Sequence, residues 1–443
     1  MRKLFGTDGM RGLAGEYPLN PAATFALGSA LAHWARSRNA SDEIVIGMDT
    51  RESGPGIAEH VAGGLAVEGV RARFAGLITT PGLAHAARVG PFAAGVMISA
   101  SHNPYRDNGI KIIDHSGFKL PDEEEHAIER ELFLRLEQGT APAPKPLKVD
   151  EGLDVEYLAH LETAAPGGLA GMHVTVDGAN GSASFLAPAL FERLGARVST
   201  MGCSPDGRNI NLNCGSLHLD GLRVHTINNK ADVGVAFDGD ADRALFVSAS
   251  GKIVDGDAVM FLLARALHKQ GRLSEVVATV MSNLGLERAL RRYGIGLVRT
   301  AVGDKYVLQE MLRRDAPLGG EQSGHIILRD YATTGDGMLT ALRVFDAMRE
   351  SGASLDALTA EVESYPQLLV NVRVKHKRPL EELDGANREI RTAEAEFGDT
   401  GRILVRFSGT EPLARVMVEG PHLERVRHFA NSIANAIRLD LGE

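Results

Sequence analysis

Three times along the chain, a β-branched apolar run ends in a polar loop, and helical periodicity then leads to a second such run and loop. The first pair is EIVIGMD and AAGVMISASHNP, the second MHVTVDGANG and DVGVAFDGDADR, and the third EVVATVMSN and APLGGEQSGH. Apolar strands that alternate with helices are typical of α/β units whose sheets are buried on both faces. Ligands of such sheets bind at the carboxyl ends of the strands, so we expect the three second loops to converge on one cleft.

The length of the chain predicts several domains, because 443 residues exceed the ~250 to 300 at which single cores stop growing. The proline-rich stretch QGTAPAPKPLKV follows an expected acidic helix and is the clearest linker. From residue 367 the pattern changes to two strands, LLVNVRVK and GRILVRFSG, and a helix with an apolar stripe of Leu423, Val426, Phe429, Ile433 and Ile437. We therefore predict α/β domains at 1–148, 149–251 and 252–365, and a smaller α+β domain at 366–443.

Charge and composition exclude several classes of protein. A formal net charge of -9 with no run of Lys or Arg argues against a nucleic-acid partner. No apolar stretch approaches the ~20 residues that span a bilayer, and the amino terminus lacks the apolar core of a secretory signal. We expect no membrane partner and a cytoplasmic location, with Cys203 and Cys214 as reduced thiols.

The loop FDGDADR places Asp238, Asp240 and Asp242 directly after a buried strand. Three neighbouring carboxylates repel one another unless a cation lies among them, and oxygen ligands near phosphate suit Mg²⁺. An EF-hand is excluded, because Arg243 and Ala249 stand where it needs Gly and Glu. A solvated acidic turn, or a phosphatase with Asp238 as the nucleophile, remain alternatives.

The loop ISASHNP places Ser101, followed by His102, at another strand end, where a serine can act as a nucleophile or phosphate carrier. Lys111 follows shortly and could pair with a phosphate. An ordinary turn serine and a solvated lysine are the plain alternatives.

Two further loops suggest sugar and phosphate binding. In GGEQSGH, Glu321 and Ser323 would point to one side of an extended segment and could hold vicinal hydroxyls, with His325 nearby. In RFSGTEPLAR, two arginines, two hydroxyls and a glycine could cradle a phosphate, namely Arg406, Ser408, Gly409, Thr410 and Arg415. Ordinary turns are the alternative for both, and no P-loop motif is present.

Together the four loops resemble the alpha-D-phosphohexomutase superfamily, in that family's order and over nearly the whole chain. LFGTDGMRG and PDGRNINLNCGS are similar to the bacterial phosphoglucosamine mutase branch. The resemblance implies three similar mixed-sheet α/β domains and a smaller, mobile α+β domain around a central cleft. It also implies that Ser101 is phosphorylated and holds Mg²⁺ together with Asp238, Asp240 and Asp242.

The resemblance implies roles for the remaining site residues as well. Lys111, Arg243, His102 and Arg11 belong to the catalytic set, for proton transfer or charge neutralisation. Substrate would be held by Glu321, Ser323, His325, Arg406, Ser408, Gly409, Thr410 and Arg415.

The expected activity is interconversion of glucosamine 6-phosphate and glucosamine 1-phosphate. Glucosamine 1,6-bisphosphate would be the intermediate and activator, and the product would feed UDP-N-acetylglucosamine and cell-wall synthesis. The same resemblance suggests a homodimer. The alternatives are a phosphomannomutase or phosphoglucomutase of the same superfamily, the aspartate-nucleophile phosphatase, and a non-catalytic sugar-phosphate-binding protein.

Overall fold

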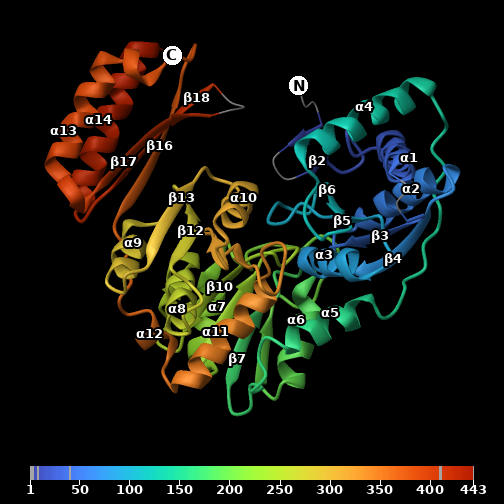
Figure 1. Ribbon diagram of the computed structural model, residues 1–443, viewed down its shortest axis with the longest axis horizontal. Coiled ribbons are helices and arrows are strands. Elements are labelled where there is room, and N and C mark those ends of the chain that lie inside the picture. The colour runs from blue at the N-terminus through green and yellow to red at the C-terminus, as the bar shows by residue number, and fades with distance from the viewer. Residues whose placement is uncertain (1–3, 7–8, 39–40, 409–411, 443) are drawn as a thin grey trace. The chain divides into compact units, whose positions relative to one another are not determined.

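The structure is a computed structural model that describes residues 4–6, 9–38, 41–408 and 412–442. The chain separates into two compact units, Met1–Met281 with Leu297–Thr359, and Ser282–Gly296 with Ala360–Glu443 (Figure 1). Among the described residues, no helix is long and apolar enough to cross a membrane.

The first sheet of the larger unit is six-stranded and mixed. Its order is β1 (Phe5–Gly6), β2 (Gly9–Leu13), β6 (Asp107–Asp114), β5 (Ala94–Ile98), β3 (Glu43–Met48) and β4 (Arg71–Leu77). Strand β3 pairs in parallel with β4 and β5, whereas β6 runs antiparallel to β5 and β2. The carboxyl end of β5 therefore delivers Ser101 beside the strand that carries Lys111.

Helices cover both faces of this sheet, as continuous apolar strands predict. On one face, Ile44 and Ile46 share a core with α1 (Pro21–Ser37), α2 (Gly54–Val67) and α4 (Asp122–Gln138). Val45 points to the other face and packs with α3 (Thr80–Val89). Helix α1 begins where the Asn20 side chain accepts from the amide of Ala23, with Pro21 at the first helical position.

The second and third sheets also contain both parallel and antiparallel strand pairs. The second has the order β11 (Ile253–Val254), β10 (Ala244–Ser248), β9 (Val233–Phe237), β7 (His173–Asp177) and β8 (Arg197–Met201). The third has the order β13 (Gly296–Thr300), β12 (Glu275–Thr279), β14 (Leu318–Gly320) and β15 (Ile326–Leu328). Their helices are α5 (Leu153–Glu162), α6 (Ala183–Arg193), α7 (Leu219–Asn228), α8 (Gly256–Lys269), α10 (Asp304–Arg314), α11 (Gly337–Ser351) and α12 (Leu355–Leu358).

The smaller unit contains an antiparallel sheet of β16 (Gln367–Arg373), β18 (Leu413–Glu419) and β17 (Arg402–Phe407). Helices α9 (Leu284–Arg291), α13 (Asp384–Phe397) and α14 (Leu423–Leu441) belong to it. Strand β18 and helix α13 were not predicted from the sequence, and the prediction that Leu423 belongs to the apolar stripe is wrong, because its side chain is 43% exposed. Leu423 is the first residue of α14, one turn before the buried stripe, which instead continues to Leu441.

The predicted fold class is confirmed: three mixed-sheet α/β modules precede a smaller α+β module. The domain limits themselves stay predictions.

Candidate active site

Ser101 lies directly beyond β5, in a backbone conformation that costs free energy. Its φ is 51°, in the left-handed region that side chains other than glycine rarely adopt, and the residue is buried. The Ser101 hydroxyl donates to Asp238 Oδ2 at 2.5 Å, and its amide donates to the Ser99 hydroxyl at 2.9 Å. The loops after β5 and β9, far apart in sequence, are thus in direct contact.

His102 and Arg11 lie next to this serine. The Nδ1 atom of His102 is 3.2 Å from the Ser101 hydroxyl oxygen. Burial lowers the pKa of His102, and the nearby Arg243 and Arg11 guanidiniums lower it further, which favours the neutral ring. Arg11, on β2, donates to the carbonyl of Ala100 at 2.9 Å.

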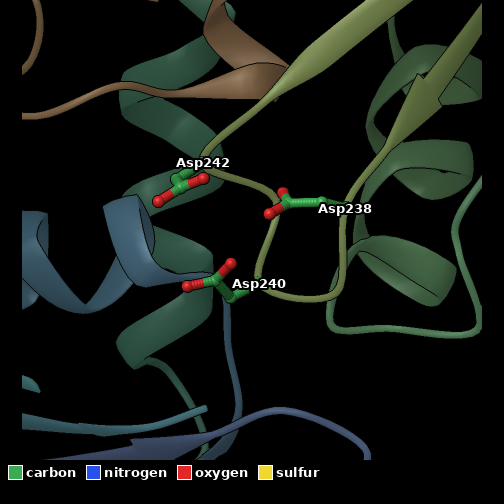
Figure 2. Close-up of side chains that lie close together, drawn as sticks. All are labelled: Asp238, Asp240 and Asp242. Carbon is green, nitrogen blue, oxygen red and sulfur yellow. The ribbon is translucent and has the colours of Figure 1, made fainter. Parts of the chain in front are cut away.

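Asp238, Asp240 and Asp242 occupy the turn between β9 and β10, and Figure 2 shows their carboxyl groups facing a shared space. All three are buried. The Lys111 side chain is 2% exposed, and its Nζ lies 2.8 Å from Asp240 Oδ2 and 3.7 Å from Asp242 Oδ2. Asp238, Asp240, Lys111 and Ser101 therefore form one buried group assembled from two sheets.

The turn that carries Asp238, Asp240 and Asp242, here called the acidic loop, has the oxygen donors that a divalent metal ion requires. One carboxylate oxygen from each aspartate lies within 4.8 Å of the others. Oδ1 of Asp240 and Oδ1 of Asp242 are buried and have no hydrogen-bond partner among the described residues, a costly state that a cation would relieve. Because all the donors are hard oxygens, the residues fit Mg²⁺ better than a soft metal ion.

The pKa values of Asp238 and Asp242 shift in opposite directions. Burial raises the pKa of Asp238 well above its ordinary value, and the Asp242 and Asp240 charges raise it further. Burial alone would also raise the pKa of Asp242, but Lys111, His325 and Arg243 outweigh burial and hold it well below the ordinary range. Asp242 consequently carries its charge more firmly than Asp238. A metal ion would favour the charged form of Asp238 too.

His325 faces Asp242 from the third sheet. Its Nδ1 lies 3.6 Å from Asp242 Oδ2, while Nε2 accepts from the Gly335 amide at 3.1 Å. Burial is the largest single effect and opposes protonation, but the charge and hydrogen bond of Asp242, together with the charges of Asp304 and Glu321, outweigh it and raise the pKa of His325. The accepting Nε2 places the proton of the neutral ring on Nδ1, toward Asp242.

Glu321 and Ser323 lie close together, but on a turn, so the extended segment predicted from the sequence is wrong. Glu321 and His325 pair across this turn, and Gly324 takes a positive φ of 93°. The Ser323 hydroxyl donates to Glu321 Oε2 at 3.4 Å, and the Gly303 amide donates to Glu321 Oε1 at 3.1 Å. The carboxylate is therefore held in place by its neighbours.

A cavity of about 530 Å³ opens beside these groups within the larger unit. The predicted site residues that line it are Arg11, His102, Asp242, Arg243, Glu321 and His325. This volume suits a small ligand with several polar groups. A larger hollow of about 670 Å³ lies near the starts of α1 and α2, and none of the predicted site residues line it.

The fourth predicted loop belongs to the smaller unit. Arg406 on β17 stands directly opposite Arg415 on β18, and burial followed by the Arg415 charge lowers the pKa of Arg406. Two like charges opposite each other are unfavourable unless an anion lies between them. Ser408 is buried, whereas Gly409 and Thr410 lie outside the described residues.

Several buried side chains that brace the site were not predicted from the sequence. Asp49 and Arg51 form an ion pair of 2.9 Å with both side chains fully buried, and Ser99 donates to the same Asp49 carboxylate at 2.7 Å. The Thr80 hydroxyl donates to Asp240 Oδ2 at 2.6 Å. Asp49 and Arg51 follow the end of β3, so their position after a strand was the available signal.

Comparison with known proteins places this geometry in a family. Four domain models of the phosphoglucomutase/phosphomannomutase family match the chain in order: α/β/α domain I at residues 2–138, domain II at 155–251, domain III at 255–365 and the C-terminal domain at 369–436. The chain belongs to this family. Among relatives of this phosphoglucomutase/phosphomannomutase family member, the phosphoglucosamine mutase of Solibacter usitatus is 58% identical over the full length of both chains. The phosphoglucosamine mutase of Koribacter versatilis is 46% identical over all of this chain and 98% of its own.

Solved structures show the same fold. A phosphoglucomutase/phosphomannomutase family protein from Burkholderia thailandensis has a TM-score of 0.81 at 21% identity, with 99% of this chain and 97% of that chain covered. N-acetylphosphoglucosamine mutase from Aspergillus fumigatus, in complex with GlcNAc-6P and magnesium, has a TM-score of 0.64 at 18% identity, with 99% and 96% covered.

Proposed function

We propose that this family member is a phosphoglucosamine mutase, an isomerase that interconverts glucosamine 6-phosphate and glucosamine 1-phosphate. The full-length relatives at 58% and 46% identity carry that name. The observation that carries the proposal is the Ser101 hydroxyl, hydrogen-bonded at 2.5 Å to Asp238 in a loop where two buried carboxylate oxygens accept no hydrogen bond from the described residues. A serine fixed beside a divalent-cation site is the arrangement that a phosphoryl carrier needs.

In the proposed reaction, phosphorylated Ser101 gives its phosphoryl group to a sugar hydroxyl. The bond between phosphorus and the serine oxygen breaks, a bond to the sugar oxygen forms, and the proton of the sugar hydroxyl is passed to the serine oxygen, which becomes a hydroxyl again. Neutral His102, whose Nδ1 lies 3.2 Å from the serine oxygen, is placed to exchange that proton. The resulting glucosamine 1,6-bisphosphate turns over and returns its other phosphoryl group to Ser101.

The surrounding residues neutralise charge and orient the sugar. Mg²⁺, when held by Asp238, Asp240, Asp242 and the phosphoserine, would offset negative charge on the transferring phosphoryl group. Lys111 and Arg243 add fixed positive charge near the same atoms. Glu321 and Ser323 would hold sugar hydroxyls beside His325. Arg406, Ser408, Gly409, Thr410 and Arg415 would hold the phosphate that is not reacting.

The wider assignment rests on membership of the family and on the sequence. We propose Mg²⁺ as the metal, glucosamine 1,6-bisphosphate as activator, a cytoplasmic homodimer, and a product that feeds UDP-N-acetylglucosamine synthesis. The four predicted domain limits belong to the same proposal. An aspartate-nucleophile phosphatase fits less well, because Asp238 is fully buried and its Oδ2 accepts the serine hydroxyl.

The decisive experiment compares Ser101→Ala with wild type and with Ser116→Ala, the same change in a hairpin turn of the first module. Ser101→Ala should lose mutase activity by about 10³-fold or more, because the carrier hydroxyl is gone. Ser116→Ala should keep it. Intact-mass analysis should find one added phosphate on wild type and none on Ser101→Ala. Full activity of Ser101→Ala would refute the proposal, and so would labelled phosphate that appears on Asp238 instead of Ser101. A comparison of kcat/KM on glucosamine 6-phosphate, mannose 6-phosphate and glucose 6-phosphate identifies the sugar.

A further inference from the structure

The loop after β8, residues 202–218, carries the PDGRNINLNCGS motif, to which the proposed reaction assigns no role. Asn211 of this loop reaches the Ser101 loop of the first sheet. Its Nδ2 donates to the carbonyl of Ser101 at 2.9 Å and to the carbonyl of Asn103 at 3.1 Å. We propose that Asn211 is a positioning residue that fixes Ser101 for phosphoryl transfer, an inference that rests on the proposed function.

The same two carbonyls also accept hydrogen bonds from Arg51. Its Nη2 donates to Ser101 and to Asn103, each at 2.9 Å. Arg51 is anchored by its buried ion pair with Asp49, in the first module. Each carbonyl therefore has two side-chain donors, one from its own module and one from the module that carries the acidic loop.

Asn211 is itself rigidly placed. Its φ is 59°, a conformation that asparagine tolerates better than most residues, and its amide donates to the carbonyl of Ala179 at 2.8 Å. Gly239 of the acidic loop packs against the same contact. A Cβ atom at Gly239 would lie 2.4 Å from the backbone carbonyl oxygen of Ser101 and 3.1 Å from Asn211 Nδ2. The Asn211 contact thus lies where the serine loop meets the acidic loop.

The consequence for the reaction follows from the strained conformation of Ser101. A residue at φ 51° keeps that conformation only where its surroundings hold it, and the two carbonyl contacts of Asn211 are part of those surroundings. Without them, the serine oxygen would no longer be held in line with its acceptor. A misplacement of about 1 Å costs about 10²-fold in rate.

The chain offers a matched pair of variants in this one loop. Asn211 and Asn213 both have positive φ, 59° and 54°, and Asn213 is exposed. Asn211→Gly removes the amide donor without adding backbone strain, and Asn213→Gly makes the same change on the exposed side. Asn211→Asp keeps the size and replaces the donor by a carboxylate oxygen that faces two carbonyls.

For Asn211→Gly we expect a loss of kcat of about 10²-fold with little change in KM, because the sugar-binding loops are untouched. Phosphorylation of Ser101 by glucosamine 1,6-bisphosphate, followed by intact mass, should slow to a similar degree. Asn213→Gly should match wild type, and Asn211→Asp should lose more than Asn211→Gly. A lower urea midpoint with unchanged kcat would mark a merely structural role.

The outcomes separate this inference from the proposed function. If wild type shows neither mutase turnover nor phosphoserine, the proposed function fails. If wild type is active and Asn211→Gly and Asn211→Asp both keep its kcat, the positioning role is wrong. Should Asn211→Gly fail to fold, Asn211→Asp and the rate at which it is phosphorylated decide alone.

Discussion

Replacing Lys111 by methionine tests the electrostatics of the buried group most directly. Lys111 is 2% exposed, and its Nζ lies 2.8 Å from Asp240 Oδ2. Methionine fills much of the same space but leaves the buried carboxylates without their lysine. Removing one partner of a buried ion pair costs about 3–5 kcal/mol, a large part of the ~5–15 kcal/mol that stabilises a typical native protein.

The loss should depend on pH and on metal in a defined direction. Lys111 helps to hold the pKa of Asp242 in the folded protein below its ordinary value. The stabilisation that results is complete above about pH 4, and it is lost as the pH falls through the pKa of Asp242 in the folded protein. The Lys111→Met penalty should therefore be largest near neutral pH and shrink in acid. Added Mg²⁺ should reduce it, because the ion replaces the missing positive charge and binding stabilises the native state.

The assay is urea unfolding in EDTA, followed by tryptophan fluorescence. The chain has one tryptophan, Trp34, which lies on α1 in the core of the sheet that bears Lys111. The control is Lys305→Met: Lys305 pairs with Asp122 at the surface, with side chains 31% and 49% exposed, and should lose about 0–1 kcal/mol. If the two variants are equally stable in EDTA, the reasoning is wrong.

Two further predictions concern single groups. Burial raises the pKa of Cys203 to about 11 and that of Cys214 to about 12. Both thiols should therefore react with iodoacetamide at pH 8 far more slowly in the native protein than in the unfolded protein. Equal reaction rates in the two states would contradict this prediction. Burial raises the pKa of Asp336 to about 6, so the stability gained from its protonation is complete below about pH 4 and lost as pH rises through about 6. Asp336→Asn should remove that pH dependence from urea midpoints, and an unchanged profile would contradict the assignment.

How much of the site could be predicted from the sequence depended on distance along the chain. Asp238, Asp240 and Asp242 stand within five residues after an apolar strand, so their spacing and the strand end already indicated a cation site. Glu321 and Ser323 were expected together for the same reason. Their turn was not foreseen, because two pairing strands around Gly324 override the local pattern.

The smaller unit shows the same limit. The pattern of α14 predicted a helix with an apolar stripe, but only packing against the sheet revealed that the stripe begins at Val426 and not at Leu423. Strand β18 was not predicted because its first residues, Leu413–Arg415, belong to the motif RFSGTEPLAR, which indicated a phosphate-binding loop.

The sequence by itself determined the alternation of strands and helices and the polar loops at strand ends, because these depend on side-chain periodicity over a few residues. Only the tertiary structure decided which loops meet. Asp238 lies 137 positions from Ser101 and Asn211 lies 110 positions from it, yet both contact it through hydrogen bonds. Such pairs form because the first and second sheets pack with the loops at their strand ends in contact, and no local pattern specifies that packing.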